Sequence, residues 1–183
     1  EILSPDFPIL PDEALDMLRS LCKKEHPNII IGTSMGGMFA GQLRGYRKIL
    51  VNPAFHVSEF MRTQIGVHEF LNPRQDGKTQ YEITSELCDA YQAIEKCQFE
   101  DLSPFDQNKT YALFGKNDTL VHGHDEFIAH YKKDNARWFE GEHRLNFEIT
   151  KDIVVPLIHK IMKEEHIPLF GLESQEPIKN FDF

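Results

Sequence analysis

The sequence predicts an α/β domain, a three-layer sandwich built around a mainly parallel sheet. Two observations indicate this class. Short β-branched and aromatic runs, each flanked by turn residues, recur along the chain, and segments with apolar residues at helical spacing separate them. Such alternation implies right-handed crossovers between parallel strands. With 183 residues the chain has the length of one domain.

The first third of the chain reads as helix, strand, helix, strand. A helix begins near Pro11, has acidic residues in its first turn and ends before Pro27. Residues 28–32 form a short apolar run typical of a strand buried on both faces. A helical pattern follows over residues 38–43, and residues 48–52 predict a second buried strand that ends at a proline.

The remainder continues the alternation after an interruption. Residues 54–81 lack a clear period and read as irregular, whereas residues 83–97 follow one helical face. Strands are predicted over residues 110–115 and 136–140, a helix between them over residues 123–132, and a closing helix over residues 149–161. We expect a single domain over residues 1–183, with residues 54–108 as an irregular and helical excursion near the candidate site described below.

Composition excludes several functional classes. The 20 Lys and Arg residues against 29 Asp and Glu give a net charge of −9, which argues against partners such as nucleic acid or an anionic membrane. No apolar run approaches the ~18 residues of a transmembrane helix. The three cysteines show no C-x-x-C spacing, so neither a disulfide framework nor a zinc knuckle is indicated. We expect reduced thiols and a cytoplasmic protein.

A nucleophile motif follows the first predicted strand. Residues 32–36 read Gly-Thr-Ser-Met-Gly, a G-x-S-x-G placed between a strand and a helix, which is the context of a nucleophile elbow. The glycines on either side of Ser34 let the backbone pass closely, and the N–H of Met35 becomes an oxyanion-hole donor. A glycine-rich turn that only packs a helix on a sheet is the alternative. A phosphate-binding loop fits less well, because no Gly-Lys-Ser/Thr follows.

A serine nucleophile needs a base and a carboxylate that orients the base. Asp118 comes just after the third predicted strand and His143 just after the fourth, in the chain order that an elbow serine predicts. Either residue alone has an ordinary explanation, as a helix cap or a structural histidine. Together they predict the triad Ser34, Asp118 and His143.

Other candidate sites are weaker. The His-Gly-His-Asp sequence over residues 122–125 suggests a metal site only if further ligands come from elsewhere in the chain. In the irregular segment, histidines and apolar side chains could face a pocket, although exposed loops explain such histidines, and core packing such apolar residues, more often. These residues are His56, His68, Phe55, Phe60, Met61 and Phe70.

The chain resembles the YqiA-like esterases, a small bacterial branch of the α/β-hydrolase superfamily. The resemblance runs from about Leu3 to Leu157 and is carried by the elbow, the Asn-Pro-Ala at residues 52–54, the Asn-Pro at 72–73, residues 77–81, and the segments around Asp118 and His143. It implies a carboxylic-ester hydrolase with a Ser-Asp-His triad, no metal and no organic cofactor.

One departure from the family concerns the start of the chain. Family members open with a strand and a turn whose backbone N–H completes the oxyanion hole, and residues 1–5 match the strand that follows it. We therefore expect an α/β-hydrolase fold that lacks its N-terminal strand and has an exposed sheet edge, which favours a homodimer. Loss of one oxyanion donor would slow turnover by about 10²–10³-fold.

The leading hypothesis is a serine esterase whose small-molecule substrate is an ester with a small or medium acyl group. It hydrolyses this ester through an acyl-enzyme. Ser34 attacks the carbonyl, His143 moves the proton and Asp118 orients the imidazole. An acyl thioesterase would use the same residues. A non-catalytic or crippled hydrolase-fold binding protein is the alternative from another class.

Overall fold

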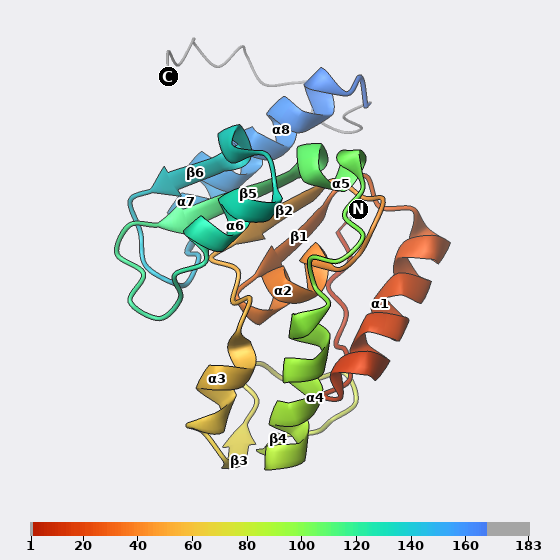
Figure 1. Ribbon diagram of the computed structural model, residues 1–183, viewed down its shortest axis with the longest axis vertical. Coiled ribbons are helices and arrows are strands. Elements are labelled where there is room, and N and C mark those ends of the chain that lie inside the picture. The colour runs from red at the N-terminus through yellow and green to blue at the C-terminus, as the bar shows by residue number, and fades with distance from the viewer. Residues whose placement is uncertain (1, 168–183) are drawn as a thin grey trace. The chain divides into compact units, whose positions relative to one another are not determined.

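The computed structural model describes residues 2–167 (Figure 1). The chain divides after Arg144 into two compact units, which we describe separately, and the expectation of a single domain stays a prediction. Among residues 2–167, no helix has both the length and the apolar character that crossing a membrane requires.

The first unit contains a four-stranded parallel sheet with the strand order β1-β2-β5-β6. Its strands are β1 Ile30–Thr33, β2 Lys48–Val51, β5 Thr110–Gly115 and β6 Ala136–Phe139. These are the four predicted strands, and every residue of β2 and β5 is buried, as their apolar runs predict. Strand β1 forms one edge and is less buried than predicted, since Ile31 is 44% exposed.

Helices of this unit pack into apolar cores. Helix α1 spans Pro11–Glu25, and α2 spans Met35–Gly41. Phe39 of α2 packs with residues of α1 and with Tyr91, while its neighbour Ala40 packs with β2, β5 and α6 (His124–His130). Because adjacent α2 residues enter different cores, the start of this helix is fixed relative to the sheet.

The segment after β2 is more ordered than the sequence predicts. It contains helix α3 Val57–Arg62, an antiparallel ribbon of β3 Gly66–Glu69 and β4 Gln80–Ile83, and helix α4 Ser85–Lys96. In Figure 1 these elements lie together, away from β5 and β6. The ribbon escapes sequence analysis because each strand has four residues, too few to establish a period of two.

Further helical segments lie within residues 2–167. Helix α5 Pro104–Lys109 has a proline in its first turn and a Ser103 cap, and a 3₁₀ turn, η1, spans Lys133–Asn135. In the second unit, α7 Phe147–Ile149, the π-helical turn η2 Thr150–Val154 and α8 Val155–Glu164 follow without a break. This stretch contains the predicted closing helix.

A buried ion pair lies near the start of β2. The Nζ of Lys48 donates to Asp106 Oδ1 and to the carbonyl of Leu43, each at 2.8 Å, and both charged side chains are almost fully buried. Asp106 also accepts from Gly45 N and Ser103 Oγ. Burial opposes ionisation of Asp106, but these donors outweigh it and hold the pKa of the carboxyl below its usual value.

We expect Asp106→Asn to lower the free energy of unfolding by about 3–5 kcal/mol at neutral pH, because the buried Lys48 ammonium would lose its carboxylate partner. Since the folded pKa is depressed, this stabilisation is present above the unfolded value of about 3.9 and disappears as the pH falls through the folded value. Urea denaturation of both proteins across the acid range measures the difference.

The matched control is Asp89→Asn, which removes an exposed partner of Arg62 and should cost less than about 1 kcal/mol. Equal losses for the two variants would contradict a special role for the buried pair.

Candidate active site

Ser34 lies on the tight turn between β1 and α2. Its φ of 53° and ψ of −123° are rare for a residue with a side chain, and such strain is typical of nucleophile elbows. The turn is tied to the end of β2, because Ser34 N donates to Val51 O at 2.9 Å and Ala54 N donates to Ser34 O at 3.0 Å. These bonds hold the serine at the carboxyl edge of the sheet.

The glycines of the motif have unequal roles. A Cβ on Gly32 would lie 2.1 Å from Gly36 O, and a Cβ on Gly37 would lie 3.0 Å from Pro53. A Cβ on Gly36 would meet nothing within 4 Å. The interpretation that both motif glycines permit a close backbone approach is therefore right for Gly32 and wrong for Gly36; Gly37 makes the second close approach.

Asp118 follows β5 in a short turn and is buried. Its N–H donates to Gly115 O at 3.1 Å, while its Oδ1 accepts from Leu120 N at 2.8 Å and Val121 N at 3.1 Å. With one oxygen held by two backbone amides, the carboxylate has a fixed orientation and presents Oδ2 to His143.

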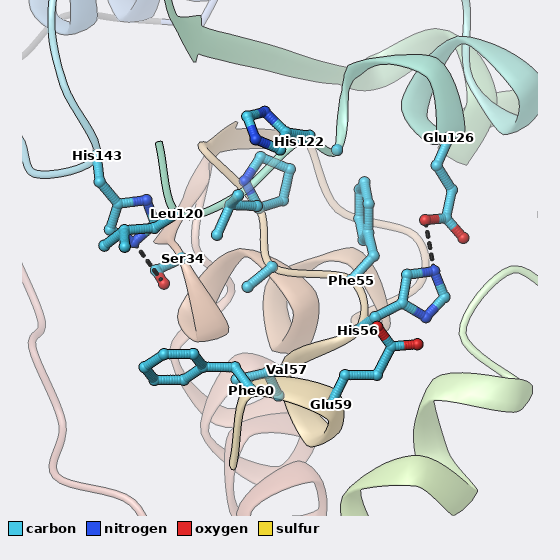
Figure 2. Close-up of a pocket in the computed structure, with 14 residues that line it drawn as sticks. Ser34, Phe55, His56, Val57, Glu59, Phe60, Leu120, His122, Glu126 and His143 are labelled. Carbon is cyan, nitrogen blue, oxygen red and sulfur yellow. Dashed lines mark hydrogen bonds and ion pairs between the residues drawn. The ribbon is translucent and has the colours of Figure 1, made fainter. Parts of the chain in front are cut away.

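His143 follows β6 and lies between the other two residues. Its Nδ1 is 2.8 Å from Asp118 Oδ2. Its Nε2 is 2.9 Å from Ser34 Oγ, the bond drawn as a dashed line in Figure 2. A carboxylate only accepts, so Nδ1 carries the hydrogen, and in the neutral ring Nε2 is left to accept from the serine hydroxyl. The structure brings together side chains that are 109 and 25 residues apart in the sequence.

The His143 loop approaches the end of β5 closely. A Cβ on Gly115 would lie 2.7 Å from the carbonyl oxygens of both Gly141 and Glu142. Any side chain at position 115 would therefore displace the loop that carries His143.

Met35, the predicted oxyanion-hole donor, is the first residue of α2. Its N–H belongs to the first turn, whose amides have no acceptor within the helix. Its role in binding an oxyanion stays a prediction.

A pocket of about 320 Å³ lies beside Ser34 and His143. Figure 2 shows apolar side chains, among them Val57, Phe60 and Leu120, between the serine and the opposite side of the pocket, where His56 Nε2 donates to Glu126 Oε2 at 2.7 Å. Apolar walls beside a nucleophile suit the hydrocarbon part of a substrate.

Only some of the suggested pocket residues line it. Phe55, His56 and Phe60 do so. By contrast, Met61 belongs to the apolar core, the His68 ring is bonded to the carbonyl of Gln64, and the Phe70 ring packs against that of Tyr81. Sequence analysis missed Leu120 and Val121, for which the position directly after Asp118 was the available signal, and Glu126, which lies in the first turn of α6.

Helix α3 supplies one wall of the pocket, and hydrogen bonds to a residue of α4 hold it in place. Glu95 is buried, and its carboxylate accepts from the backbone N of Ser58 at 2.7 Å and from the hydroxyl of the same residue. Burial raises the pKa of Glu95, although the bonds from Ser58 oppose the rise. This contact fixes the first turn of α3, and with it Val57.

Within residues 2–167 the structure supplies no further ligands for the metal site suggested over residues 122–125. Among residues 2–167 no three His, Cys, Asp or Glu side chains are grouped to hold a metal ion. His122 lines the pocket, whereas His124 Nδ1 is bonded to Asp125.

Solved structures with similar folds define the class. Est1E from Butyrivibrio proteoclasticus is 14% identical with a TM-score of 0.59 over 86% of this chain and 71% of that chain. A Paleococcus ferrophilus monoacylglycerol lipase is 10% identical with a TM-score of 0.54, covering 84% and 75%. Mouse alpha/beta hydrolase domain-containing protein 10 is 11% identical with a TM-score of 0.52, covering 85% and 70%. The chain has the α/β-hydrolase fold, as predicted.

The family is narrower than the fold. The model of an uncharacterised protein family, UPF0227, matches residues 1–152, and the chain belongs to this family. The resemblance to YqiA-like proteins is thereby confirmed. A search of curated protein sequences found no match.

The unequal glycines give a stability test of the elbow. Gly32→Ala is expected to lower the free energy of unfolding by about 1–3 kcal/mol, because the new methyl group overlaps the Gly36 carbonyl. Gly36→Ala fills open space in a helix and should be neutral or stabilising by up to about 1 kcal/mol. Urea denaturation of the pair decides this, and similar losses in both would contradict the geometry.

Proposed function

We propose that this protein is a serine hydrolase that cleaves carboxylic esters with a small or medium acyl group. The observation that carries the proposal is the continuous hydrogen-bonded chain from Ser34 through His143 to Asp118 beside an apolar pocket. In serine hydrolases this arrangement converts a weakly nucleophilic hydroxyl into an effective one.

The reaction proceeds in two halves. As Ser34 Oγ attacks the ester carbonyl, His143 Nε2 takes the hydroxyl proton, and it then gives this proton to the departing alkoxide, which leaves as an alcohol. The acyl group remains on Ser34. In the second half His143 deprotonates a water molecule, which attacks the acyl-enzyme and releases the carboxylic acid, and the proton returns to Ser34.

Asp118 and Met35 support both halves. The Asp118 carboxylate holds the Nδ1–H tautomer and stabilises the imidazolium that forms when the ring accepts a proton. The N–H of Met35 donates to the oxyanion of the tetrahedral intermediate. This hydrogen bond is stronger than the one that the same N–H makes to the neutral carbonyl of the ester.

The pocket supports the acyl-size assignment. Its volume of about 320 Å³ is at the lower end of the ~300–1,000 Å³ of small-molecule sites. The side opposite Ser34 carries the polar His56–Glu126 pair, which a hydrocarbon chain could displace only by desolvating it.

Ser34→Ala is expected to abolish both labelling by a fluorophosphonate probe and hydrolysis of p-nitrophenyl butyrate. Asp118→Asn should lower kcat by about 10⁴-fold, because the imidazole loses its tautomer. The exposed Ser20→Ala, on α1 and outside the triad, serves as control and should still be labelled. A wild-type protein that forms no Ser34 adduct and hydrolyses no ester would support a non-catalytic binding protein. A thioester of the same acyl group, assayed in parallel, distinguishes thioesterase activity.

The acyl chain gives a second test. Each CH₂ that enters the apolar part of the pocket should raise kcat/KM by up to about fourfold, which corresponds to ~0.8 kcal/mol. The rise should stop when the chain reaches the His56–Glu126 pair. A p-nitrophenyl ester series from acetate to palmitate measures this, and His56→Ala should move the plateau to longer chains. If the plateau stays at the same chain length in that variant, the His56–Glu126 pair does not limit the length of the acyl chain.

A further inference from the structure

Asn52 is a buried polar residue that directly follows β2 at the carboxyl edge of the sheet. It is 2% exposed and has a φ of 43°. Its side-chain amide is bonded only to backbone: Nδ2 donates to Glu142 O at 3.1 Å and to His143 O at 3.0 Å, while Oδ1 accepts from Gly115 N at 2.7 Å. Both amide hydrogens and the oxygen are therefore satisfied in a site shielded from water.

The same residue lies between the turns that carry the three triad side chains. Its backbone N donates to Leu113 O, and the preceding residue, Val51, accepts from Ser34 N. Asn52 thus connects the elbow on one side with the end of β5, from which the Asp118 turn begins, and with the His143 loop on the other.

The bond from Asn52 Nδ2 to His143 O holds the backbone of the residue whose imidazole contacts both Ser34 and Asp118. The loop begins with a bond from Asn117 N to Gly141 O, and Asn52 holds the next two carbonyls. A movement of this backbone by 1 Å would bring the imidazole out of hydrogen-bonding range of Ser34 Oγ or Asp118 Oδ2, and misplacement on this scale costs about 10²-fold in rate.

We propose that Asn52 is a positioning residue for the hydrolytic reaction, whose two N–H groups fix the His143 backbone so that the imidazole bridges Ser34 and Asp118. The proposal rests on the proposed function. It assigns Asn52 no contact with substrate, only control over where the base lies.

The test replaces the donors and keeps the shape. Asn52→Asp retains the size, tolerates the positive φ and still accepts from Gly115 N, but its carboxylate repels the two carbonyls instead of donating to them. Asn52→Gly removes the side chain without adding charge and suits the same φ. The second variant separates loss of the donors from the effect of a new charge, and replaces the first if that does not fold.

A matched control residue lies at the other end of the strands, where their amino ends meet. Asn135 is also buried, and its Nδ2 also donates to two backbone carbonyls, those of Asn108 and Thr110, at 2.9 and 3.0 Å. Asn135→Asp therefore makes the same chemical change at the amino end of β5, away from the triad.

Kinetics on p-nitrophenyl butyrate should show kcat lowered by about 10²-fold in both Asn52 variants, with KM changed by less than about twofold. Asn135→Asp should lower the thermal midpoint by about as much as Asn52→Asp does, and it should leave kcat within about twofold of wild type. An Asn52→Gly variant with wild-type kcat, or an equal loss of kcat in Asn135→Asp, would overturn the proposal.

A readout independent of turnover separates this proposal from the proposed function. The ring ¹⁵N shifts of His143 report its tautomer: wild type and Asn135→Asp should show the Nδ1–H form, and the Asn52 variants a mixture. If wild type neither labels at Ser34 nor hydrolyses esters, the proposed function fails, and these shifts still decide the positioning role. An unchanged Nδ1–H form in the Asn52 variants would refute it.

Discussion

The parallel register of four strands determines where all the candidate catalytic side chains lie. Thr33 pairs with Val51, Val51 with Leu113, and Gly115 with Phe139, so the chain leaves β1, β2, β5 and β6 at one edge of the sheet. The turns that follow must share this edge, and backbone bonds between them keep them together. A hydroxyl, a carboxylate and an imidazole from distant parts of the sequence thereby come within hydrogen-bonding distance.

Crowding at this edge explains which small residues are needed. Gly32 and Gly115 lie where another backbone segment passes within 3 Å of a would-be Cβ, whereas Gly36, the more conspicuous motif residue, has open space. At Gly115 the close approach involves the carbonyls of Gly141 and Glu142; Asn117 N donates to the first, and Asn52 Nδ2 donates to the second. Tight packing and polar satisfaction are therefore two aspects of the same arrangement.

The two ends of the sheet use buried polar groups differently. At the amino ends of the strands, the partners of Lys48, Asp106 and Asn135 are each other, backbone groups and the Ser103 hydroxyl, and none of the three lines the pocket beside Ser34. At the carboxyl ends, Asn52 and Asp118 hold the loops around that pocket. A buried group that lacks a partner is costly at either end, but we expect a change in catalysis only at the carboxyl edge.

The sequence by itself determined the α/β class, the four strands of the sheet and the candidates Ser34, Asp118 and His143, because apolar periodicity and the order of motifs along strands are local properties. It could not predict the β3–β4 ribbon, whose strands are too short to show a period, nor the open space at Gly36. Distances within the site, the pocket and the bonds of Asn52 were decided by the tertiary structure alone. They depend on contacts such as that between residues 52 and 143, 91 positions apart, and only the packing of the strands brings such residues together.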